Sequence, residues 1–137
     1  MSKVLEDSSL VETADKLAKY LHVVLSVEYD IDVIDRVAKA RRFDDFLEAI
    51  YNALRRKFTV ERKIRDKMSE ANEREKEFLN SALNYIKNFN PSDIEILRSR
   101  LIAQSSSIKE IASYIGSKSI ASTVLFDNLR RIFGGEG

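Results

Sequence analysis

The spacing of hydrophobic residues predicts helices along nearly the whole chain, because apolar side chains recur every three or four positions. Ser9 and Glu12 have the spacing of a capping box, so a first helix is expected from there to about residue 27. Residues 29–32 interrupt the pattern, and a short second helix follows them. A third helix is expected from about Asp45. Its predicted buried stripe consists of Phe46, Leu47, Ile50, Tyr51, Leu54 and Phe58.

The next segment has a different composition, because 12 of the 17 residues from 61 to 77 are charged. Its few apolar residues keep helical spacing, and oppositely charged neighbours three or four positions apart can pair. Residues 59–77 are therefore predicted to form a charged helical arm or a helical hairpin. Asn90 and Pro91 indicate a helix end followed by a new start. Two last helices are expected, at 108–115, ended by Gly116, and from about 119 to 133.

These patterns predict an all-α fold, a compact bundle of six to seven helices with one long charged helical arm. The length of 137 residues suits a single helical domain, 1–137, with residues 134–137 as a flexible tail. Hydrophobic residues make up 44% of the chain, which is enough for a core. The sequence contains neither an apolar stretch long enough to cross a membrane nor a signal peptide. A cytoplasmic protein without a membrane partner is expected.

The composition removes most of the side chains on which enzymes depend. The chain has no cysteine, which excludes thiol nucleophiles, cysteine zinc sites and iron–sulfur clusters. Its single histidine, His22, lies beside the apolar face of the first predicted helix, where a structural role is favoured. Asp30, Asp32 and Asp35 could attract Mg²⁺ or Ca²⁺, but the glycine and further oxygen ligands of a calcium loop are missing. We expect no enzyme, no cofactor and no metal site.

The net charge of +1 indicates no particular partner, but the charge is unevenly distributed. Residues 31–67 carry eleven basic and seven acidic residues, a local charge of +4. The planar guanidinium of arginine suits phosphate oxygens. Bases at the end of a helix are also favoured by the helix dipole, and charged residues often form only a solvated face. The candidate nucleic-acid-binding residues are Arg41, Arg42, Arg55, Arg56, Arg62 and Lys63. The aromatic residues Tyr29, Phe43 and Tyr51 lie among these bases.

Residues 108–131 have features of a helix-turn-helix. Ala112 is small enough for close helix packing, and Gly116 could adopt a left-handed turn. Such a motif reads DNA through donors at the start of its second helix. The residues available there are Lys118, Ser119, Ser122 and Thr123. Because these are few, a plain helical corner is favoured over sequence-specific recognition.

Two segments carry a resemblance to a known family. These are YDIDVIDRVAKA at residues 29–40 and FLEAIYNALR at residues 46–55, with a looser likeness in IASYIG at 111–116. They resemble the small subunit of archaeal type I-A CRISPR interference (Cascade) complexes. The resemblance implies a non-catalytic helical subunit that lines an RNA-guided surveillance complex and helps to hold the opened target DNA. Ile34, Arg36, Phe46 and Leu54 would then be scaffold positions.

The partners implied by the resemblance are other CRISPR complex subunits, the guide RNA and the target DNA, the last two through backbone contacts. Self-association is left open. Two alternatives remain beside this hypothesis. One is a helix-turn-helix DNA-binding regulator, and the other is a helical adaptor that acts through protein contacts alone.

Overall fold

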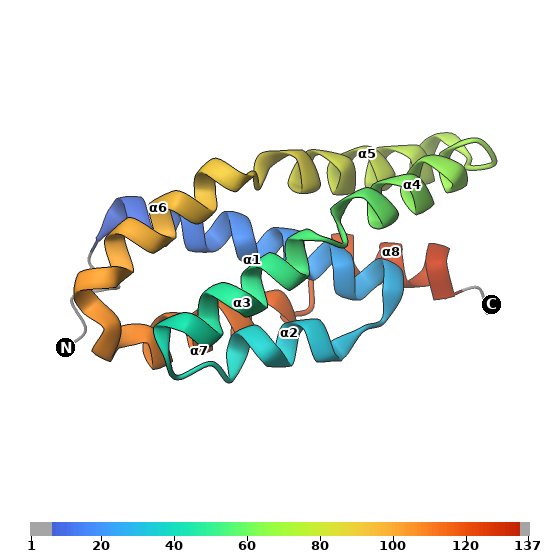
Figure 1. Cartoon of the computed structure of the whole chain (residues 1–137). Coiled ribbons are helices and arrows are strands. Elements are labelled where there is room, and N and C mark those ends of the chain that lie inside the picture. The colour runs from blue at the N-terminus through green and yellow to red at the C-terminus, as the bar shows by residue number, and fades with distance from the viewer. Residues whose placement is uncertain (1–6, 135–137) are drawn as a thin grey trace.

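The computed structural model describes residues 7–134, without the side chain of Ser105 (Figure 1). Its elements are α1 (Ser8–Glu28), α2 (Ile31–Ala38), α3 (Phe43–Leu54), α4 (Lys57–Met68), α5 (Glu73–Asn88), α6 (Pro91–Leu101), the 3-10 segment η2 (Ile102–Ser107), α7 (Ile108–Ser119) and α8 (Val124–Gly134). No strand occurs in this part of the chain, so the predicted all-α bundle is confirmed. Within the same residues, no helix combines the length and the apolar character needed to cross a bilayer.

Helix α1 is the centre of the bundle, and α4, α5, α6, α7 and α8 all pack against it (Figure 1). It is buried on most of its circumference from Leu10 to Val27, as expected for a helix surrounded by others. Its N-cap is Asp7, whose carboxylate accepts the backbone N–H groups of Ser9 and Leu10, in place of the predicted Ser9 capping box. It ends at Tyr29, which adopts a left-handed conformation with φ 60°.

The charged segment 59–77 forms the hairpin, which is one of the two forms expected for it. Helix α4 ends at Met68, and α5 begins after Asn72, whose side chain accepts the N–H of Glu75 at 2.8 Å in a capping box. The inner faces of the two helices carry Val60 and Ile64 on α4 and four apolar residues on α5. Because α5 also packs on α1 and α8, the hairpin is part of the bundle.

The predicted burial of Tyr51 and Phe58 is wrong. Tyr51 is 41% exposed and Phe58 is 71% exposed. Helix α3 ends at Leu54, and α4 starts again at Lys57 with Val60 and Ile64 facing the core. Residues two positions apart on a helix point about 200° apart, so burial of Val60 turns Phe58 to the opposite face.

The prediction that Gly116 ends a helix is wrong. Gly116 lies inside α7, which continues to Ser119, and α8 starts only at Val124. A Cβ at position 116 would overlap the Cβ of Ala38 on α2, so the glycine permits close packing of α2 on α7. The predicted stop at Asn90 and Pro91 is confirmed, with Pro91 as the first residue of α6. The predicted tail 134–137 lies outside the described residues except for Gly134, where α8 ends.

Candidate nucleic-acid interface

Helices α2 and α3 pack against each other and leave a groove of about 320 Å³ between them. Arg41 and Arg42 belong to the short link that joins the two helices, so the fold places both at one end of this groove. The lining residues are Arg36, Lys39, Ala40, Arg41, Arg42, Asp45, Glu48, Ala49 and Asn52. Four basic and two acidic side chains give this space a positive balance.

A second hollow of about 370 Å³ extends the first along the same two helices. The two share Arg36, Ala49 and Asn52, so they form one continuous depression, which we call the α2–α3 groove. The further residues that line the second hollow are Asp30, Asp32, Val33, Arg55 and Arg56. The Arg41–Arg42 end of the groove is therefore the more strongly basic one.

Most of the arginines in the α2–α3 groove retain their donors for a ligand. Arg41 and Arg42 are exposed, and neither forms an ion pair within residues 7–134. The guanidinium of Arg55 donates to the side-chain oxygen of Asn52 at 3.2 Å, which leaves most of its donors available. Lys39 lies 3.6 Å from the carboxylate of Asp35 in an exposed pair, and such pairs contribute little.

Arg56 and Lys63 are in a different situation, because both bind acidic residues of the same protein. The guanidinium of Arg56 donates to Glu28 at 2.8 Å and to Asp30, and the ammonium of Lys63 lies 3.2 Å from Glu28. We call these four residues the Glu28 cluster. The hydrogen bond to Glu28 is the main cause that raises the pKa of Arg56. Since the Glu28 side chain is only 8% exposed, Arg56 and Lys63 take the place of the water that would otherwise bind it.

The structure thus distributes the six predicted binding residues over three places. Arg41, Arg42 and Arg55 line the α2–α3 groove with donors free. Arg56 lines the second hollow of the groove too, but like Lys63 it is bound to Glu28 in the Glu28 cluster. Arg62 is exposed on α4, outside the groove. Arg36, which the resemblance implied to be a scaffold position and which is missing from the predicted binding set, is exposed and lines both parts of the groove.

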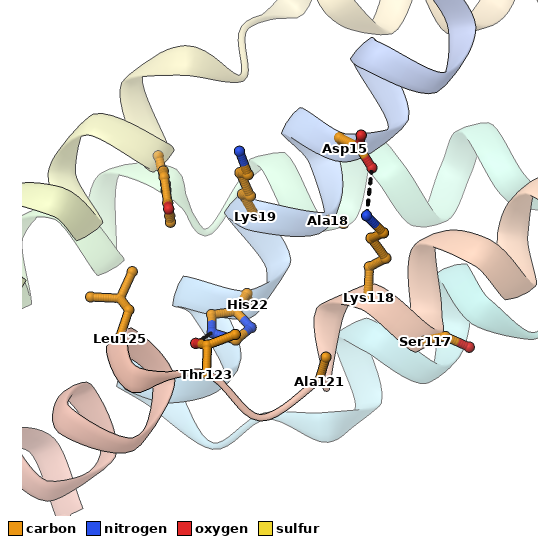
Figure 2. Close-up of a pocket in the computed structure, with 10 residues that line it drawn as sticks. Asp15, Ala18, Lys19, His22, Ser117, Lys118, Ala121, Thr123 and Leu125 are labelled. Atoms are coloured by element: carbon orange, nitrogen blue, oxygen red, sulfur yellow. Dashed lines mark hydrogen bonds and ion pairs between the residues drawn. The ribbon is translucent and has the colours of Figure 1, made fainter. Parts of the chain in front are cut away.

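A second cavity, of about 520 Å³, lies between α1, α5 and the link from α7 to α8 (Figure 2). His22 lies beside Thr123 at this cavity, and Lys118 points to Asp15 at 3.6 Å (Figure 2). The Nδ1–H of His22 donates to the Ser119 carbonyl at 3.1 Å, so Nε2 accepts the Thr123 hydroxyl at 3.2 Å. Burial lowers the pKa of His22, which favours this neutral form.

These contacts also involve the helix-turn-helix interpretation, because Ser119 and Thr123, two of its four predicted base-reading residues, are bound within the fold. Lys118 is paired with Asp15, which raises the pKa of Lys118. Ser119 is buried, and its hydroxyl donates to the Ile115 carbonyl at 2.7 Å. Thr123 bonds His22 and accepts the N–H of Phe126 at 2.9 Å. The link between α7 and α8 is therefore a hydrogen-bonded helical corner.

Within the described residues, no group of three or more histidine, cysteine or acidic side chains is arranged to hold a metal ion. Comparison of the chain with protein-family models, with curated proteins and with solved structures finds no match. The α2–α3 groove is therefore interpreted from its own residues and from the sequence resemblance alone.

Proposed function

We propose that this protein is a non-catalytic small subunit of an RNA-guided CRISPR surveillance complex that contacts nucleic-acid backbones through its α2–α3 groove. The observation that carries the proposal is the position of Arg36, Arg41 and Arg42 around one exposed groove. Each guanidinium group can donate two parallel hydrogen bonds to one phosphate. Several arginines along a groove can therefore bind successive phosphates of one strand. Such contacts position a nucleic acid without reading its sequence.

The sequence resemblance supports the same region. The segments at residues 29–40 and 46–55, which resemble the type I-A small subunit, contain α2 and most of α3. These are the two helices that form the walls of the groove. The resemblance and the basic groove, which are separate observations, therefore involve the same part of the chain.

The number of contacts limits the affinity that a single copy can reach. Arg36, Arg41, Arg42 and Arg55 offer at most a few phosphate contacts, and Asp45 and Glu48 reduce the positive charge of the groove. Affinity rises when neighbouring subunits or further copies hold several such grooves along one strand. We therefore expect weak, salt-sensitive binding by the isolated chain and firm retention within an assembled complex.

The double charge reversal Arg41→Glu/Arg42→Glu tests the groove. At about 50 mM salt, this variant should bind a labelled oligonucleotide at least about tenfold more weakly, and the slope of log K against log salt should fall by about two. The thermal midpoint should stay nearly constant, because both side chains are exposed. Fluorescence anisotropy and circular dichroism provide the two measurements.

The matched control is Lys87→Glu/Lys109→Glu, which changes the net charge equally at exposed positions of α5 and α7. It should reduce binding only slightly. Equal losses in the two variants would show that the bulk charge matters and the groove does not.

The assignment to a surveillance complex requires a separate experiment on the protein in its host. A tagged copy, purified gently with and without nuclease, should bring down several larger protein subunits and short RNAs of uniform length. Recovery of chromosomal DNA alone, or of the protein by itself, would reject the CRISPR assignment even if the groove binds oligonucleotides.

A further inference from the structure

Phe58 is the most exposed large hydrophobic side chain among the described residues, with 71% of its surface in contact with solvent. It lies in the first turn of α4, on the face opposite Val60 and Ile64, and takes no part in the core. A large aromatic side chain at such a position gives nothing to the packing of this fold. Its ring is therefore free to contact a molecule outside the chain.

The neighbours of Phe58 on this face are two arginines and Glu61. Arg62 lies one helical turn further along α4, so its side chain is on the same side as Phe58. Arg65, on the following turn, is bound to Glu61 at 2.9 Å, whereas Arg62 forms no ion pair within residues 7–134. On the other side, Arg55 lies three residues before Phe58 and leads into the α2–α3 groove.

Tyr51 extends this arrangement along α3. It lies one turn before Arg55, whose N–H donates to the Tyr51 carbonyl at 3.1 Å, and its side chain is 41% exposed. Exposed aromatic and arginine side chains thus alternate in the order Tyr51, Arg55, Phe58 and Arg62, which we call the α3–α4 edge. The other aromatics of this region are engaged, since Arg130 covers the Tyr29 ring at 4.5 Å and Phe43 packs against the core.

We infer that the α3–α4 edge binds a single-stranded nucleic acid, with an unpaired base stacked on Phe58 and the flanking phosphates on Arg55 and Arg62. The inference rests on the proposed function and adds that the bound nucleic acid is single-stranded and that one of its bases stacks on Phe58. Alternating aromatic and basic side chains are the arrangement that non-specific single-strand binding uses, because every base has a face to stack and every nucleotide has a phosphate. In a duplex, both faces of each base are already stacked, so Phe58 would find no base to cover.

A protein partner would select a different surface. The centre of a protein–protein interface is apolar and depleted of charged residues. Phe58 is flanked instead by Arg55, Thr59 and Arg62, which suits a strand with regularly spaced negative charges.

The first test uses fluorescence, because the chain contains no tryptophan. Phe58→Trp introduces a single indole at the α3–α4 edge. Its emission should be quenched when a roughly 20-nucleotide single strand is added and should hardly change with the duplex of the same sequence. The control is Ile102→Trp, at an exposed position of η2, which lies at the end of the molecule remote from the α4–α5 hairpin (Figure 1). Its emission should respond to neither.

The second test measures affinity. Phe58→Ala should weaken binding of the single strand about fivefold or more, leave duplex binding unchanged, and be rescued by Phe58→Tyr. Phe58 is exposed, so the thermal midpoint should stay the same. Equal losses for single strand and duplex, or no loss for either, would overturn the stacking role.

The failures of the two proposals are distinguishable. If Arg41→Glu/Arg42→Glu weakens binding while Phe58→Ala does not, the groove contacts the backbone and the stacking inference is wrong. If the unmodified chain binds neither form at low salt, the proposed backbone contact fails, and the stacking inference fails with it.

Discussion

Two pairs of basic residues, Arg41–Arg42 and Arg56–Lys63, belong to the same basic segment, 31–67, but differ in their surroundings in the fold. The first pair lies at the α2–α3 groove, exposed and without an ion pair inside residues 7–134. The second pair binds Glu28, whose carboxylate is nearly buried between them. A basic residue therefore acquires a structural or a binding role from the acidic residue that the fold brings to it.

The Glu28 cluster shows how far apart in sequence such partners lie. Glu28 is the last residue of α1, and Arg56 lies 28 positions later at the start of α4. Their contact joins two helices, and loss of Arg56 would leave a nearly buried carboxylate with one partner fewer. Arg41 has no acidic partner within residues 7–134, so it can exchange bound water for a phosphate without loss of a contact that stabilises the fold.

The largest expected change in stability and binding comes from a substitution that displaces α2. This helix forms one wall of the groove, and the contact between Arg56 and Glu28 does not involve it. Gly116→Val should lower the free energy of unfolding by about 2–3 kcal/mol, because the added side chain overlaps Ala38 at the contact of α7 with α2. Oligonucleotide affinity should fall as well, since α2 carries Arg36. Urea unfolding and fluorescence anisotropy measure the two effects.

The control for this change is Ser117→Val, at the exposed neighbouring position of α7, which should alter stability by less than about 0.5 kcal/mol. The exchange Gly116→Ala/Ala38→Gly should recover most of the stability that Gly116→Ala loses, because it removes the overlapping Cβ from the other helix. If the exchange recovers nothing, the contact between α2 and α7 is not the origin of the loss.

A smaller effect is expected from the Glu28 cluster. Arg56→Ala should lower the free energy of unfolding by about 1–2 kcal/mol, less than for a fully buried pair, because 38% of the Arg56 side chain is exposed and Lys63 still binds Glu28. Oligonucleotide affinity should change little, because the guanidinium of Arg56, although it lines the groove, is already bound to Glu28 and Asp30. Arg41→Ala, measured in the same urea titration, should leave stability within about 0.5 kcal/mol and weaken binding. The distinction between the two pairs fails if both variants change the same property.

The smallest effect is expected from pH, which separates His22 from the arginines because only the histidine titrates near neutrality. Burial lowers the pKa of His22 in the folded state, so the unfolded chain takes up the proton first. The resulting stability is fully present above the ordinary histidine pKa of about 6.5 and declines as the pH falls below it, by no more than about 1.4 kcal/mol per pH unit.

Urea unfolding at about pH 7.5 and about pH 5.5 should therefore show a larger loss for the unmodified protein than for His22→Gln. The Gln side chain does not titrate and offers both a donor and an acceptor to Ser119 and Thr123. An identical loss in both proteins would assign the pH dependence to the carboxylates. Oligonucleotide affinity should be the same at both pH values, because the groove arginines keep their charge throughout this range.

Much of the fold could be predicted from the sequence because its signals are local. The apolar positions of α1, the Asn90–Pro91 boundary and the charged hairpin depend on residues within a few turns of each other. The candidate site was predictable only in part. The basic segment identified Arg41, Arg42 and Arg55, but nothing local distinguished them from Arg56 and Lys63.

Local sequence signals were enough to predict a helical chain, the helix boundary at Asn90–Pro91 and the segment rich in basic residues. The tertiary structure alone decided which of those residues face solvent and which meet an acid. Phe58 has the spacing of a core residue but is exposed, because Val60 and Ile64 are the α4 residues that face the core. Gly116 looks like a helix end but is a contact point, because Ala38 of α2 packs against it. Hydrophobic periodicity reports the neighbours of a residue along one helix, whereas burial and ion pairing depend on helices that are distant in the sequence.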